Sequence, residues 1–103
     1  MALNPLTAGL APMHPGEFLR EINLPALALT KAEVARRLGI SRQTLYDILA
    51  ERQPVTAAMA LRLGKFFGNT PDFWLNLQRD YDLRVLSARM ADELAAIEKV
   101  EAA

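Results

Sequence analysis

Seven steric conditions of a sharp two-helix corner are met within one window of 20 residues, 31–50. Ala35, the fifth residue of this window, is small enough for a second helix to cross close to it. Gly39, the ninth, permits the left-handed backbone of a tight turn. The other five positions are apolar and can bury the inside of the corner: Val34, Leu38, Ile40, Leu45 and Ile48. We therefore predict a helix-turn-helix over residues 31–50; an ordinary helical hairpin with a glycine turn is the alternative.

Helix-capping residues predict five helices along the chain. The expected starts are His14 with Pro15 in the first turn, Thr30 with Glu33 as a capping box, Ser41, Thr56, and Thr70 with Pro71 in the first turn. Gly39 and Gly68 are expected to end the second and fourth helices, and the fifth should reach at least Val85. No segment alternates polar and apolar residues as a strand does, so the predicted fold class is all-α.

Charge is unevenly distributed, although the chain as a whole is neutral with 12 basic and 12 acidic residues. Residues 31–70 contain seven bases and three acids (+4), whereas residues 71–103 contain four bases and seven acids (−3). A nucleic-acid footprint depends on the charge of one face and not on the total for the chain. Neutrality therefore does not exclude DNA binding, and the basic middle segment is where DNA would bind.

The outward face of the third predicted helix carries side chains suited to reading bases. Arg42 could donate two hydrogen bonds to guanine, and Gln43 could pair with adenine. Asp47 could accept from cytosine or orient Arg42 or Gln43, and Tyr46 could pack on a thymine methyl group or reach a phosphate. The candidate base-reading set is thus Arg42, Gln43, Tyr46 and Asp47. For each residue alone, a solvated helix face is the alternative.

Four further residues are candidates for holding the DNA backbone. Ser41 and Thr44 lie in or beside the first turn of the third predicted helix, Lys31 starts the second, and Arg52 follows the third. Phosphate contacts of this kind set the register of a protein on DNA without reading its sequence.

Three phrases outside the window resemble the HigA/VapI family of antitoxins from bacterial toxin–antitoxin modules. They are HPGEFLRE (14–21), VTAAMALRLGKFFG (55–68) and TPDFWLNLQRDYDLR (70–84). The window itself resembles the Xre/Cro type of helix-turn-helix. One departure is Ala50-Glu51, where the family commonly has Asn-Gly. Glu51 adds negative charge where a phosphate would approach, which leaves Arg52 as the contact in this loop.

The resemblance implies a five-helix, lambda-repressor-like DNA-binding domain with a C-terminal helical extension. It further implies a homodimer that binds palindromic operator DNA, represses its own operon and neutralises a HigB-like, RelE-class ribonuclease toxin. A solitary Xre-type repressor without a toxin is one alternative, and a protein-interaction module with a vestigial helix-turn-helix is another. We divide the chain into a flexible arm (1–13), the helix-turn-helix domain (14–86) and a helical tail (87–103).

Apolar residues continue at helical spacing beyond the last family phrase. Their spacing predicts one stripe on a long amphipathic helix: Leu83, Leu86, Met90, Leu94, Ile97 and Val100. The stripe could pack on the chain's own core, on a second subunit or on the toxin. Nearer the start of the fifth helix, Phe73 and Trp74 are expected to pack in the core against Phe66 or Phe67.

Several classes of function are not expected. The chain has no Cys and a single His, so a metal site, a nucleophile–base pair and an enzymatic activity are all unexpected. No cofactor and no small-molecule substrate are expected. No run approaches the roughly 18 apolar residues of a membrane span, and the first residues lack the basic start of a secretory signal. We therefore expect a cytoplasmic protein that is nucleoid-associated when bound to DNA.

Overall fold

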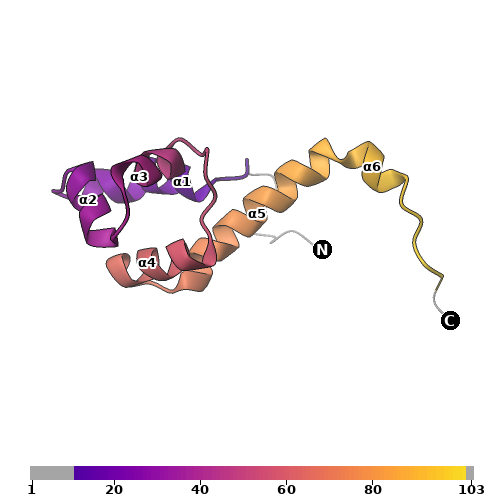
Figure 1. The fold of residues 1–103 in the computed structure, drawn as a ribbon. Helices are drawn as coiled ribbons and strands as arrows, with labels where there is room; N and C mark the ends of the chain where they lie inside the picture. Colours follow the sequence, from indigo (N-terminus) through magenta and orange to yellow (C-terminus); the bar gives the residue numbers. More distant parts are fainter. Residues whose placement is uncertain (1–10, 102–103) are drawn as a thin grey trace.

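The computed structural model describes residues 11–101, and across them it is helical with no strand (Figure 1). The helices are α1 (Pro15–Phe18), extended by the π-helical turn η1 (Leu19–Asn23) and the 3-10 turn η2 (Leu24–Ala26), then α2 (Lys31–Leu38), α3 (Arg42–Leu49), α4 (Ala57–Phe67), α5 (Pro71–Arg89) and α6 (Ala91–Ala95). The predicted all-α class is confirmed. Most of the predicted arm, residues 1–10, lies outside the described residues.

The predicted helix starts are confirmed by side-chain caps. The hydroxyl of Thr30 accepts from the backbone N–H of Glu33 at 3.1 Å, and that of Ser41 accepts from Thr44 at 3.0 Å. The hydroxyls of Thr56 and Thr70 accept in the same way, each from the N–H three residues later. Each cap satisfies one of the N–H groups that have no partner inside a helix. Local chemistry between neighbours in the sequence therefore places these boundaries.

The core is built around Trp74, which is fully buried. Its ring lies 5.6 Å from that of Phe67 and 5.9 Å from that of Phe18, measured between centroids, and its indole Nε1 donates to Asn69 Oδ1 at 2.8 Å. The expectation that Trp74 packs against Phe67 is confirmed. Phe73 differs from expectation, because it is 37% exposed at the edge of this cluster. The core thus joins α1, α4 and α5 under the helix-turn-helix.

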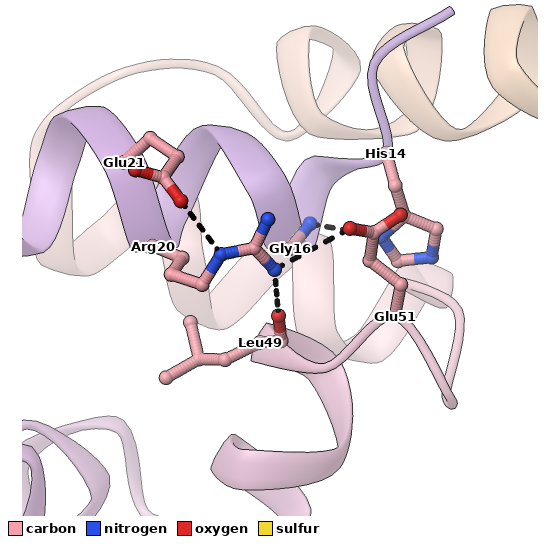
Figure 2. Close-up of polar contacts among 6 residues, drawn as sticks. All are labelled: His14, Gly16, Arg20, Glu21, Leu49 and Glu51. Atoms are coloured by element: carbon pink, nitrogen blue, oxygen red, sulfur yellow. Dashed lines mark hydrogen bonds and ion pairs between the residues drawn. The ribbon is translucent and has the colours of Figure 1, made fainter.

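Gly16 brings the first helix into contact with the backbone of α3. A Cβ atom at this position would lie only 1.9 Å from the carbonyl oxygen of Ile48, so no larger side chain fits without a shift of one of the two segments. Figure 2 shows Gly16 beside the end of α3, close to Leu49 and Glu51. Since Gly16 has an ordinary backbone angle, the requirement for glycine is the close approach alone.

The tail departs from the predicted single stripe. Helix α5 ends at Arg89 and Met90 separates it from the short α6, so Ile97 and Val100 lie beyond any helix. Figure 1 shows α5 leaving the cluster of α1 to α4 and carrying α6 at its far end. Leu94 is 44% exposed and Val100 is 85% exposed. Packing of the tail on the chain's own core is therefore the one alternative that the structure contradicts.

His14 caps α1 from a buried position. The residue is only 3% exposed, and its Nδ1 accepts from the N–H of Gly16 at 2.9 Å (Figure 2). Its ring meets that of Tyr81 edge-on, with 5.0 Å between the centroids. Burial lowers the pKa of His14 below its ordinary value of 6.5, against the opposing effect of the Glu51 and Asp82 carboxylates. The neutral ring is the form that the cap requires, because protonation of Nδ1 removes the acceptor.

We predict that His14 makes the free energy of unfolding fall on mild acidification. As the pH drops below 6.5 the unfolded chain binds a proton that the folded chain resists, so stability decreases until the pH reaches the lowered pKa. His14→Asn keeps a capping side chain but does not titrate. Urea unfolding of both proteins between pH 7 and pH 5 (about the range of histidine titration) should therefore diverge. Parallel curves would contradict the prediction.

Candidate nucleic-acid interface

The four predicted base-reading residues share the outward face of α3. Leu45, Ile48 and Leu49 are buried on its inner face. Arg42, Gln43 and Tyr46 are exposed and Asp47 is half-buried. The sequence alone leads to this placement, because the buried residues recur at helical spacing. The structure brings the candidate set together on one surface, and their contact with bases stays a prediction.

Asp47 is the centre of a hydrogen-bonded group on this face. Its Oδ1 accepts from Nε2 of Gln43 at 2.9 Å and from Nη2 of Arg52 at 2.9 Å. The Arg52 guanidinium, and then the Gln43 amide, hold the pKa of Asp47 below its ordinary value. Of the two partners expected for Asp47, the structure shows Gln43 and not Arg42. Asp47 therefore orients one candidate reading side chain and offsets the charge of one candidate backbone contact.

Arg42 stands apart from this group. Among the described residues it is exposed, at the first position of α3, and it makes no hydrogen bond or ion pair. A guanidinium without a partner at the start of a recognition helix is free to form two parallel hydrogen bonds with a base edge. Within residues 11–101, the guanidinium of Arg42 is therefore available for a base, whereas the amide of Gln43 and the carboxylate of Asp47 bind each other.

The remaining candidates connect α2 to the first turn of α3. The Ser41 hydroxyl accepts from the N–H of Thr44 and also donates to its hydroxyl at 2.9 Å, so both groups take part in the cap. Lys31 Nζ lies 5.9 Å from the centre of the Tyr46 ring. Between them, Ala35 is 1% exposed and Gly39 has a φ of 74°. The candidates for phosphate contact, Lys31, Ser41 and Thr44, thus lie beside the reading face.

Much of the basic charge counted in residues 31–70 has a partner within the protein. Glu33 binds the guanidinium groups of Arg36 and Arg37, which lowers its pKa to about 2. Because of these ion pairs the Glu33 side chain does not close the second half of the predicted capping box. Arg62 binds backbone carbonyl groups of α2 and its turn. Charge counting in the sequence could not reveal these partners, and it therefore overstated the free charge of the segment.

Glu51, which follows α3, has a left-handed backbone with a φ of 62°. This is the position where the HigA/VapI family commonly has glycine, and glycine alone adopts such angles without cost. Its carboxylate accepts from Arg20 Nη1 at 3.3 Å (Figure 2). The departure from the family pattern therefore places a strained residue, held by an ion pair, at the end of the recognition helix.

We predict that Glu51→Gly stabilises the protein, with a net gain of roughly 0.5–1 kcal/mol in the free energy of unfolding. The relief of the left-handed backbone is worth about 1–2 kcal/mol, and it exceeds the loss of a partly exposed ion pair, worth about 0–1 kcal/mol. Glu51→Ala is the matched control, since it removes the carboxylate and keeps the strain. Urea unfolding should rank glycine above wild type and alanine below it. Equal stability of the glycine and alanine variants would show that residue 51 carries no strain.

Comparison with known proteins matches residues 19–74 to the helix-turn-helix family HTH_3. Virulence-associated protein I of Dichelobacter nodosus is 40% identical over 73 residues, which cover 71% of this chain and 68% of that protein. No helix in residues 11–101 is long and apolar enough to cross a membrane. The match to HTH_3 spans most of the core, the turn and the reading face described above.

Solved structures agree with this assignment. Antitoxin GraA in complex with its operator superposes with a TM-score of 0.83 at 40% identity, and the match covers 99% of this chain and 100% of that one. The Pseudomonas aeruginosa antitoxin HigA, solved with the higBA promoter, gives a TM-score of 0.80 at 37% identity over 87% of this chain and 99% of that one. This chain belongs to the HigA/VapI family of antitoxins, which carry an Xre/Cro-type helix-turn-helix.

Proposed function

We propose that this chain is a homodimeric antitoxin that binds palindromic operator DNA, represses its own operon and neutralises a HigB-like ribonuclease toxin. The observation that carries the proposal is the reading face of α3, where Arg42, without a hydrogen-bond or ion-pair partner among residues 11–101, lies beside Gln43 and Asp47. The relatives GraA and HigA were solved on an operator and a promoter, which supports the same use of this face. The mechanism is binding, with no catalytic step.

The proposed division of labour follows the contacts within the protein. Arg42 reads guanine through O6 and N7, and Gln43, held by Asp47, reads adenine through N6 and N7. Tyr46 contacts a thymine methyl group or a phosphate. The DNA backbone is held by Lys31, Ser41, Thr44 and Arg52. Arg52 must then bind phosphate while it shares Asp47, so its contribution to affinity is smaller than that of a free cation.

We infer that the dimer forms through the end of α5 and through α6. Leu83 is 38% exposed and Leu86 is 46% exposed on a helix that extends away from the body of the protein. Beyond them, Arg89 is followed by Asp92 and Glu93, so that two antiparallel copies would place opposite charges together. A symmetric dimer that reads a palindrome must hold its two recognition helices about 34 Å apart.

The toxin is the least specified partner. The acidic charge of residues 71–103 suits a basic, RNA-cleaving protein through electrostatic complementarity. We therefore propose that the toxin binds the acidic surface beside the dimer contact, within the predicted tail 87–103. In this division the domain 14–86 binds DNA and, at its end, also supplies Leu83 and Leu86 to the dimer contact.

The proposal is tested with the full chain in two binding experiments. Fluorescence anisotropy is measured with DNA from upstream of its own gene and with a scrambled duplex, and size exclusion gives the mass of the complex. The chain is then co-expressed with the product of the neighbouring reading frame. We expect preference for the upstream DNA, two chains per site, and a stable complex that removes the ribonuclease activity of the neighbour. Equal affinity for both duplexes would refute operator binding. DNA preference without a toxic neighbour would leave a solitary repressor.

A further inference from the structure

Two arginines from other helices bind the carbonyl ends of both helices of the helix-turn-helix. Arg62 of α4 donates from Nη1 to the carbonyl oxygen of Leu38 at 2.8 Å and to that of Gly39 at 3.4 Å. Arg20 of η1 donates from Nη1 to the carbonyl oxygen of Leu49 at 2.5 Å, as Figure 2 shows. Leu38 and Leu49 are the last residues of α2 and α3. Each helix therefore ends on a guanidinium supplied by a distant part of the chain.

These contacts satisfy groups that the helices leave open. The last carbonyl groups of a helix have no partner within it, and a cation there is favoured by the helix dipole. Across residues 11–101, no backbone N–H donates to the carbonyl oxygen of Leu38 or Leu49. The two arginines fill this role from outside the motif, so they tie α4 to the turn and α1 to the end of the recognition helix.

Because Gly39 has no side chain, the guanidinium of Arg62 can lie close to the turn. A Cβ atom at residue 39 would lie 2.6 Å from Arg62 Nη1, in addition to requiring a φ of 74°. The glycine of the turn therefore serves two purposes: it permits the left-handed backbone, and it leaves room for the guanidinium that caps α2.

Arg20 lies in surroundings that favour an internal role. Its Nε donates to Glu21 at 2.9 Å and its Nη1 also contacts Glu51 at 3.3 Å. Two carboxylates beside one guanidinium leave a negative local charge, which repels a DNA phosphate. The cation is thus directed at the end of α3 and at its own acidic neighbours.

We propose that Arg20 and Arg62 are positioning residues for base reading: they set the angle of α3 and of the turn before it, and they do not bind DNA. The inference rests on the proposed operator binding and adds two residues to it. A small rotation of α3 would displace Arg42 and Gln43 from the base edges, while phosphate contacts, which carry no sequence information, would serve any duplex alike.

The test separates positioning from phosphate contact. Binding by wild type, Arg20→Met, Arg62→Met and Lys65→Met is measured at several salt concentrations. The probes are a duplex that the wild type selects from a random pool and a scrambled duplex of equal length. Lys65→Met is the matched control, because it removes an exposed positive charge from the same helix as Arg62. Circular dichroism at the binding temperature verifies folding, and Arg20→Lys and Arg62→Lys decide the question if a methionine variant unfolds.

We expect each arginine variant to lose about tenfold or more in affinity for the selected duplex, as for the loss of a hydrogen bond to a charged group. Affinity for the scrambled duplex and the dependence on salt should stay near those of wild type. Equal loss on both duplexes with a salt slope reduced by about 0.9 would identify a phosphate contact and overturn the inference. Unchanged affinity in folded variants would also overturn it. A wild type that selects no sequence would instead refute the proposed function itself.

Discussion

Gly16→Ala is expected to lower the free energy of unfolding by about 3 kcal/mol or more, at the upper end of the range for an overpacked interior. The added methyl group would meet the carbonyl oxygen of Ile48 at 1.9 Å and the His14 ring at 3.1 Å. A backbone atom cannot turn away as the end of a side chain can, so α1 and α3 must separate. Urea unfolding measures the loss, and the separation should also weaken operator binding at temperatures where the variant is folded.

Gly68→Ala is the matched control for this prediction. Gly68 has a φ of 75°, but nothing lies within 4 Å of the Cβ atom that alanine would add. The control therefore reports only the cost of a left-handed backbone, roughly 1 kcal/mol. If Gly16→Ala is no more destabilising than Gly68→Ala, the close contact between α1 and α3 is not a constraint on the fold.

Arg42→Ala is expected to weaken binding to the operator by 10- to 100-fold, which corresponds to about 1–3 kcal/mol for the loss of a bidentate contact with a base. Since Arg42 makes no hydrogen bond or ion pair with the described residues, stability should change little. Selection of binding sites by the variant should relax at one base pair in each half-site. Fluorescence anisotropy on wild-type and singly substituted operators measures both effects.

Lys65→Ala provides the comparison for charge, because it removes one exposed cation outside the reading face. A variant at Arg42 that loses no more affinity than the Lys65 variant, and that keeps the full base preference, would remove Arg42 from the reading set. Gln43 and Asp47 would then remain as the residues expected to contact the bases.

The position of the reading face could be predicted from the sequence, but the pairing of its charged side chains could not. Helical spacing was enough to place Arg42, Gln43, Tyr46 and Asp47 on one side of α3. It did not determine which cations stay free, because Asp47 reaches both four residues back and five residues forward. Side-chain pairing on a surface depends on rotamers and on the competing partners in reach. Charge totals for a segment therefore say little about the charge that a DNA phosphate would meet.

By itself the sequence determined the helix starts, the turn at Gly39 and the family of the protein. The helix starts and the turn depend on residues within a few positions of one another, as in the contact between Thr30 and Glu33, and the family shows in short phrases of the sequence. Only the tertiary structure decided that Gly16 must be small, that Arg20 and Arg62 cap the helix-turn-helix, and that the tail leaves the core. The arginine caps join residues 29 and 24 positions apart. Such contacts exist only after the chain has folded, so no local pattern records them.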